Sequence, residues 1–258
     1  MTKSVSIIGS GPAGLLAAHA ADTLGWDFRI LSQVKKSNLL GCQYLRNAVP
    51  GMTEEKPIVI NCHLEGTPEE YRTKMYGSDT TGVKDNENYE DNRYAWDLRT
   101  AYDKLWIAYG KELQYWLVQP DDLDLLRGAD VVISTVPRQT WAELGDVFNS
   151  YTIWVACDEP YEGIPAPFRP EPSTIIRDGT SDVGWYKASN VFGHSAVEWP
   201  EATKPPLTRL HKVTRPLGHN STAASDIHHL GSYGAWDRSE LASNVYEQAL
   251  KVLAEDRI

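Results

Sequence analysis

A glycine-rich turn between a short apolar strand and a helix, near the start of the chain, limits the folds open to it. The strand is expected at residues 5–8, the turn reads GSGPAG at 9–14, and small, mostly apolar residues follow at 15–21. In such a turn the first glycine permits a tight bend, the second leaves room for a pyrophosphate, and the third lets the helix pack on the strand. A second apolar strand is expected at 28–31. The pattern predicts a βαβ unit that binds a dinucleotide; an ordinary βαβ unit with a glycine-rich turn is the alternative.

The composition excludes several classes of protein. With 258 residues the chain has room for one large domain, or for one domain with an insertion. The formal net charge of −10 argues against a direct nucleic-acid-binding groove. No apolar run is long enough to cross a membrane, and the first residues show no signal-peptide pattern. Three widely spaced cysteines are typical of reduced thiols, not of a disulfide framework or a metal site. We therefore expect a cytoplasmic protein that holds no metal.

The nucleotide-binding pattern breaks after residue 52. A strand is predicted at 57–62, followed by a helix that begins with a capping box, with Thr67 at the N-cap and Glu70 three residues later. That helix ends at Gly77, and the polar stretch 77–92 is either an active-site lid or a surface connector. Apolar residues at helical spacing predict a further helix at 95–109.

The pattern resumes after a short helix at 120–127. An apolar strand is predicted at 129–137, then a helix at 140–148, strands at 151–157, 189–197 and 207–214, and a proline-rich loop at 159–172. The last segment repeats the opening order: a strand around 227–230, a glycine turn at 231–234 and a helix at 237–254, with Asp237 as its N-cap.

These elements predict an α/β fold with two regions. A Rossmann-type dinucleotide-binding domain is expected from residues 1–52, 128–150 and 216–258. An inserted α+β region, which would cap the site or bind substrate, is expected from residues 53–127 and 151–215. Ligands of such sheets bind at the carboxyl ends of the strands, so the end of the strand at 129–137 is expected beside the glycine turn.

One position departs from the usual pattern. The second strand of a site for NAD or FAD usually ends with an Asp or Glu that holds a ribose hydroxyl. Ser32 stands at this point, and Lys35 and Lys36 follow it. Ser32 bonds a ribose more weakly than a carboxylate does. The lysines favour the phosphate of NADP, or they form a solvated surface pair.

Two glycine turns around an inserted region give the chain a likeness to known enzymes. The turn at 9–14 and the ending Gly231-x-Tyr233-Gly234-x-Trp236 before the last helix resemble FAD-dependent oxidoreductases of the glutathione-reductase-type Rossmann fold. The ending is similar in layout to that of UDP-galactopyranose mutases and amine oxidases. Residues 40–45 and the same ending also resemble small FAD/NAD(P)-binding oxidoreductase-like proteins of actinobacterial phages. This last resemblance implies a host cytoplasm and a role in modifying nucleotides or DNA bases.

The resemblance implies that FAD lies extended between the two turns. The residues expected to bind it belong to the first turn, the strand ends and the closing turn: Gly9, Ser10, Gly11, Pro12, Ala13, Gly14, Ser32, Gln43, Leu45, Thr135, Pro137, Gly231, Ser232, Tyr233 and Trp236. Candidates for contact with substrate at the flavin are Cys42, Tyr44, His194 and Trp236. Three of them have a structural alternative: a buried thiol for Cys42, a hydrogen-bonded strand residue for His194, and an anchor of the last helix for Trp236.

Three functions fit these features. The first is an FAD-dependent oxidoreductase that transfers hydride or electrons between the flavin and a small molecule or nucleotide, or uses the flavin for a non-redox elimination. The second is an NAD(P)-dependent dehydrogenase. The third is a cofactor-free Rossmann scaffold that acts as a binding or inhibitor protein. The substrate, the electron acceptor and the oligomeric state leave no signal in the sequence.

Overall fold

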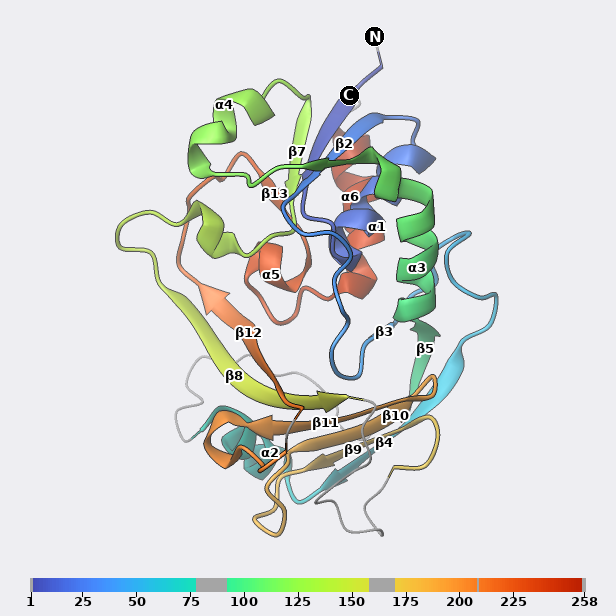
Figure 1. The fold of residues 1–258 in the computed structure, drawn as a ribbon, viewed down its shortest axis with the longest axis vertical. Coiled ribbons are helices and arrows are strands. Elements are labelled where there is room, and N and C mark those ends of the chain that lie inside the picture. The colour runs from blue at the N-terminus through green and yellow to red at the C-terminus, as the bar shows by residue number, and fades with distance from the viewer. Residues whose placement is uncertain (1, 78–91, 158–169, 208, 257–258) are drawn as a thin grey trace.

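The computed structural model describes residues 2–77, 92–157, 170–207 and 209–256, and it contains two sheets (Figure 1). The first sheet has five parallel strands in the order β13-β7-β1-β2-β6. Its members are β1 (Ser4–Ile8), β2 (Asp27–Ser32), β6 (Leu113–Tyr115), β7 (Val131–Ser134) and β13 (His228–His229). Strands at its centre are buried on both faces and are therefore apolar along most of their length, as in β7.

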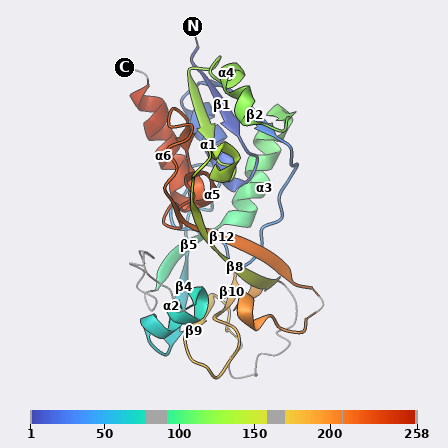
Figure 2. The same cartoon turned by 90° about the vertical axis from the view of Figure 1, so that its left-hand side faces the viewer.

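Helices α1 (Pro12–Thr23), α3 (Leu98–Tyr109) and α6 (Ala242–Glu255) surround one face of this sheet (Figure 2). The main apolar core lies between them and joins Leu15 and Ala18 of α1 to Leu105 of α3 and Val245 of α6. The small side chains of α1 permit this close packing, because four of its alanines are fully buried. A second core on the other face includes Val132 and Trp141. Short helices complete this layer: η1 (Gly110–Glu112), η2 (Pro120–Asp122), α4 (Leu123–Leu126), η3 (Arg138–Trp141) and α5 (Gly231–Ala235).

The second sheet is curved and lies beneath the first layer (Figure 1). Its eight strands follow the order β12-β8-β11-β10-β9-β4-β5-β3, and all pairs are antiparallel except β4 with β9. The strands are β3 (Tyr44–Leu45), β4 (Ile58–Glu65), β5 (Arg93–Asp97), β8 (Phe148–Cys157), β9 (Thr174–Asp178), β10 (Lys187–Val191), β11 (His194–Pro200) and β12 (His211–His219). Helix α2 (Pro68–Tyr76) and the short η5 (Glu201–Thr203) flank it.

Several predicted elements are confirmed. The strands at 5–8 and 28–31 and the helix after the first turn are present as β1, β2 and α1. The capping box of α2 is complete: the Glu70 amide donates to Thr67 Oγ1 at 3.2 Å, and the Thr67 amide donates to Glu70 Oε2 at 2.7 Å. Most of the stretches 77–92 and 159–172, which we predicted to be loops, fall outside the described residues.

Other predictions of local structure are wrong. Residues 95–97 belong to β5, because Ala95 pairs with Ile58 of β4, and the helix starts at Leu98 with Asp97 as its N-cap. The predicted helix at 140–148 is only the short η3, and Phe148 already pairs with β12. The single strand predicted at 189–197 is a hairpin, β10 and β11, which turns at Phe192 and Gly193.

The closing helix also differs from the prediction. Asp237 does not cap it; its carboxylate accepts hydrogen bonds from the amide and hydroxyl of Ser239, at 2.8 and 2.7 Å. Helix α6 begins five residues later, after Leu241, and the glycine turn itself forms the short α5. The start of α6, from Leu241 to Ser243, borders the larger cavity described below.

The division of the chain into a dinucleotide-binding domain and an inserted region stays a prediction, and the two sheets place some segments differently from it. Helix α3 and strand β6 lie within 53–127, yet they pack on α1 and pair with β2 in the parallel layer. Among the described residues, no helix is long and apolar enough to pass through a bilayer.

Candidate functional site

The three glycines of the first turn are held for different reasons. An added Cβ at Gly14 would lie 1.9 Å from the carbonyl oxygen of Gly9, and one at Gly9 would lie 2.5 Å from Thr135 Oγ1. Gly9 also has a φ of +108°. Both positions are thus explained by packing within the chain. Gly11 is different: it has an ordinary φ of −69°, and a Cβ there would meet no atom within 4 Å.

The closing turn packs onto the first one. An added Cβ at Gly231 would lie 3.0 Å from Ala13 Cβ, and one at Gly234 would lie 2.5 Å from the carbonyl oxygen of Ser134 at the end of β7. The Leu230 amide donates to the same Ser134 oxygen at 3.0 Å. The structure therefore brings together the two glycine turns and the carboxyl end of β7.

Ser32 is engaged with the protein itself. The Ser10 hydroxyl lies 3.0 Å from Ser32 Oγ and 2.8 Å from the carbonyl oxygen of Val34, and the Val34 amide donates to Ser32 Oγ at 3.1 Å. Both serine side chains are buried. Lys36 forms an ion pair with Asp103 of α3. Ser32 thus stands where a ribose-binding acid is usual, and its hydroxyl is bonded to that of Ser10.

A cavity of about 500 Å³ lies between the first glycine turn and the curved sheet. Gly11 and Pro12 of the first turn border it, and so do Ser232 and Tyr233 of the closing turn. Its further lining comes mainly from the segment 37–46, from α2, from β5 and β8 to β12, and from residues that flank these elements. Those residues include Cys42, Gln43, Tyr44, Arg46, Tyr71, Arg93, Tyr151, Ile175, Arg177, Tyr186, Lys187, Glu198, Val213, Arg215 and Arg238.

The curved sheet supplies the part of the cavity lining that is here called the floor, and a buried carboxylate belongs to it. Glu198 is 2% exposed and accepts a hydrogen bond of 2.5 Å from the Tyr186 hydroxyl. Lys187 Nζ donates to Glu198 Oε1 at 3.0 Å, and Arg215 Nη2 lies 3.5 Å from the same oxygen. Burial alone would raise the pKa of Glu198, but the two positive charges and the hydrogen bonds lower it to about 2. The negative charge of Glu198 in turn raises the pKa of Arg215 above its ordinary value, although burial by itself would lower it.

The segment 37–46 covers this carboxylate. Arg99 of α3 donates to the carbonyl oxygens of Leu39 and Gly41, at 3.1 and 2.9 Å, and so holds the segment in place. The Gly41 amide points to Cys157 Sγ at 3.0 Å, and an added Cβ at Gly41 would lie 3.1 Å from Glu198 Oε1. Burial raises the pKa of the neighbouring Cys42 thiol, which favours the protonated form.

The predicted site residues divide into two groups. Cys42, Gln43, Tyr44, Ser232 and Tyr233 border the cavity with Gly11 and Pro12. The others are not among the residues that line it. Leu45 is fully buried in the main core, and Trp236 is 2% exposed, with its Nε1 donating to the Asn149 carbonyl at 2.9 Å. His194 starts β11 opposite Val191. The roles of Trp236 and His194 at a flavin stay predictions.

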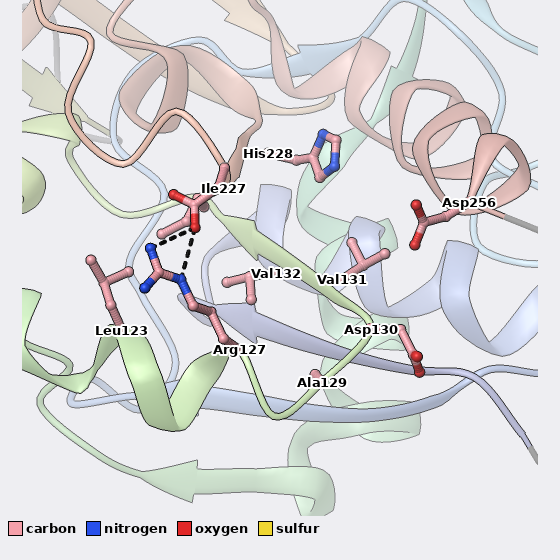
Figure 3. A pocket seen from close by; sticks show the side chains of 10 residues that line it. Leu123, Arg127, Ala129, Asp130, Val131, Val132, Ile227, His228 and Asp256 are labelled. Carbon is pink, nitrogen blue, oxygen red and sulfur yellow. Dashed lines mark hydrogen bonds and ion pairs between the residues drawn. The ribbon is translucent and has the colours of Figure 1, made fainter.

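A smaller cavity, of about 290 Å³, lies at the other end of the parallel sheet (Figure 3). It borders Ala129 and Val131 at the amino end of β7, and Arg127 and Asp226 form an ion pair of 2.8 Å beside it. Ligands of such sheets bind at the carboxyl ends of the strands. The larger cavity is therefore the candidate functional site.

The charged floor was not predicted. Arg177, Lys187, Glu198 and Arg215 lie 10 to 38 positions apart and carry no recognisable motif. They meet because Lys187 pairs with Arg177 on one side and with Glu198 on the other. Strand β8 lies between β11 and β12, and the Arg215 side chain of β12 reaches Glu198 from there. Only the strand register brings them to one face.

Neither a protein-family model nor a curated protein matches the chain. Its structure is similar to a reduced UDP-galactopyranose mutase, with a TM-score of 0.55, 12% identity and coverage of 99% of this chain and 94% of that one. It is similar to a variant of HpxO from Klebsiella pneumoniae complexed with FAD, with a TM-score of 0.55, 13% identity and coverage of 100% and 81%. A 2,6-dihydroxypyridine-3-hydroxylase from Arthrobacter nicotinovorans gives a TM-score of 0.57, 10% identity and coverage of 99% and 84%.

At this level of identity the likeness establishes the fold. It extends over both sheets, since each comparison covers nearly the whole chain. The predicted fold class, a Rossmann-type α/β layer with an inserted α+β region, is confirmed, and the chain shares it with these three proteins.

Proposed function

We propose that this protein is an FAD-dependent oxidoreductase that acts on a small molecule bound in the larger cavity. The observation that carries the proposal is Gly11. It is the N-cap of α1, borders the cavity and faces open space, so no packing contact within the protein requires a glycine there. A pyrophosphate that approaches the backbone at the start of α1 does account for it.

The residues present fit FAD at this place. Gly11 to Gly14 and the start of α1 would hold the pyrophosphate, since a helix N-terminus favours negative charge and α1 has no acidic residue in its first turn. Cys42 to Tyr44 and Ser232 to Tyr233 would border the ring system, because they join the glycine turn to the cavity. One of the proteins that share this fold is complexed with FAD.

FAD, when bound, supplies the hydride or electron transfer. The chain's own part is to hold the substrate and to exclude water. The tyrosines of the cavity wall supply apolar surface for this, and the buried charges of the floor orient the substrate. A nucleotide or DNA-base substrate, as the phage resemblance implies, is a narrower form of the same proposal.

One observation favours a second candidate, the cofactor-free scaffold. The Ser10–Ser32 hydrogen bond satisfies, within the protein, two hydroxyls that would otherwise be free for a ribose. In that case the protein folds and binds its partner without a nucleotide. An NAD(P)-dependent dehydrogenase is the third outcome that the same experiment separates.

The test is the absorption spectrum of the freshly purified full-length protein, followed by that of the supernatant after heat denaturation. We expect a yellow protein that releases FAD. Gly11→Ala is expected to lower FAD affinity about tenfold by placing a methyl group against the pyrophosphate. Gly218→Ala is the control, because Gly218 also faces open space and does not border the cavity.

A colourless protein whose melting temperature does not rise with added FAD would exclude the flavin. A rise with NADPH alone would favour the dehydrogenase, and no rise with either would favour the scaffold.

A further inference from the structure

The larger cavity has a charge opposite to that of the protein as a whole. The full sequence carries a net charge of −10. Yet among the described residues that line the cavity, six are cationic and one is acidic. The cations are Arg46, Arg93, Arg177, Lys187, Arg215 and Arg238, and the acid is Glu198. A cavity whose lining is mainly positive attracts negatively charged ligands and raises their local concentration.

Three neighbouring strands present the charges in one row across the sheet. Lys187 on β10 pairs with Arg177 on β9 and with Glu198 on β11. Arg177 is 5% exposed, and the Lys187 side chain is 17% exposed. Arg215 reaches the row from β12. Burial of this kind is costly for a cation, and the single carboxylate of Glu198 balances only one of these three positive charges.

The carboxylate of Glu198 does not accept a hydrogen bond from every N–H group of these cations. One carboxylate oxygen serves both Lys187 and Arg215, while the other accepts from Tyr186. Within the described part of the chain, Arg215 Nε is buried without a hydrogen-bond partner. A guanidinium has five N–H donors, whose fork suits a carboxylate or a phosphate.

The remaining wall of the cavity is aromatic and apolar. Five tyrosines border it (Tyr44, Tyr71, Tyr151, Tyr186 and Tyr233), together with Ile175 and Val213 from the sheet. Such a wall suits the flat or apolar body of a ligand and leaves the charged row to bind one polar end.

We propose that the substrate of this site is a small molecule with an aromatic or apolar body and one anionic group, which binds to Arg215 and Lys187. The shared chemistry of the anionic group is that of a carboxylate or a phosphate. Glu198 acts as an internal counter-ion, which holds the two cations in position and competes with the ligand's anionic group. This inference rests on the proposed function, because it names the substrate class for the same cavity.

The experiment measures ligand binding by calorimetry at constant ionic strength, with the FAD content of each sample recorded. Benzoate is compared with benzamide, and phenyl phosphate with phenol. Each pair differs in the charged group and keeps the ring. We expect at least one anion to bind tenfold or more tightly than its neutral partner, and the better pair identifies the source of the charge.

Three variants locate the binding. Arg215→Gln is expected to weaken binding of the preferred anion about 10- to 100-fold. Glu198→Gln is expected to tighten it, because the internal competitor is neutralised. Lys212→Gln is the matched control: it removes a cation from the same strand, but Lys212 pairs with Glu201 and lies outside the cavity lining.

Equal affinity for the charged and neutral ligands overturns the inference. So does weaker binding in Glu198→Gln, or equal loss in Arg215→Gln and Lys212→Gln. If circular dichroism shows that Arg215→Gln does not fold, Arg215→Lys and Glu198→Gln decide the question. A sample that binds FAD without preferring anions refutes this inference alone. A sample that prefers anions and takes up no FAD refutes the proposed function alone.

Discussion

Gly231, near the end of the chain, packs against Ala13 near its beginning, so that a Cβ added to Gly231 would lie 3.0 Å from the Cβ of Ala13. The contact joins the closing turn to the helix that carries the first glycine turn. Gly231 also has a φ of +74°, in the left-handed region that favours glycine. The closeness of the two turns thus depends on the absence of one side chain.

Gly231→Ala is therefore expected to lower the free energy of unfolding by about 2 to 4 kcal/mol, since backbone strain and overpacking add. Gly51→Ala is the control. Gly51 has a similar φ of +73°, but a Cβ there meets no atom within 4 Å, so we expect a loss of only about 1 kcal/mol. Chemical denaturation of both variants measures the difference. Equal losses would show that the contact with Ala13 adds nothing.

Alanine substitutions at Gly14 and Gly11 are expected to differ in their effect on stability, because only Gly14 is packed within the protein. In the absence of cofactor, Gly14→Ala forces a methyl group against the Gly9 carbonyl and should lower the free energy of unfolding by about 3 kcal/mol or more. Gly11→Ala should lower it by about 1 kcal/mol or less, because the methyl group faces open space and the only cost is that alanine is a poorer N-cap than glycine. Thermal unfolding of cofactor-free samples provides the measurement. A large loss in Gly11→Ala would mean that Gly11 is needed for folding.

The buried carboxylate of Glu198 gives stability a pH dependence on the acid side. Its pKa of about 2 in the folded protein is below its ordinary value, because the charges of Lys187 and Arg215 outweigh burial. The ionised form therefore contributes up to about 3 kcal/mol above pH 4.5, and this contribution is lost as the pH falls toward 2.

Glu198→Gln tests this dependence. At pH 7 the variant is expected to be less stable than the wild type by about 3 kcal/mol, and the difference should shrink steadily between pH 4.5 and 3. Glu201→Gln, which breaks the exposed pair with Lys212, is the control. Urea denaturation at several pH values gives the comparison. A difference between wild type and Glu198→Gln that stays constant with pH would contradict the assignment.

His229 is expected to act in a different pH range. Burial, with the charge of Arg138 nearby, lowers the pKa of His229 to about 4, and its Nε2 lies 3.2 Å from the Ala224 carbonyl oxygen. The unfolded chain then binds more protons than the folded one between pH 4 and 6.5, so stability falls as the pH falls through this range, by about 2 kcal/mol.

The NMR titration of the His229 ring protons measures this pKa directly. His229→Gln should remove the loss of stability between pH 6.5 and 4, while His228→Gln, at the exposed neighbouring position, controls for the loss of an imidazole. A midpoint near 6.5 for His229 would contradict the effect of burial.

The sequence by itself determined the centre of the parallel layer, which consists of β1, α1, β2 and β7. A strand, a glycine turn and a helix specify one another over short distances, because the turn allows the bend and the apolar residues have one face to bury. The same holds for α2, whose capping box is formed by two residues three positions apart. The glycine turn also indicated where a dinucleotide would bind.

Only the tertiary structure decided the curved sheet and its charged floor. Residues 95–97 directly precede a run of apolar residues at helical spacing and were predicted as part of that helix, yet they belong to β5, because Ala95 pairs with Ile58 of β4. Glu198, Lys187 and Arg215 gave no signal, because they meet only through the pairing of β10 with β11 and of β11 and β12 with β8. Register is set by long-range pairing, and it decides both which side chains share a face and which charges a ligand would meet.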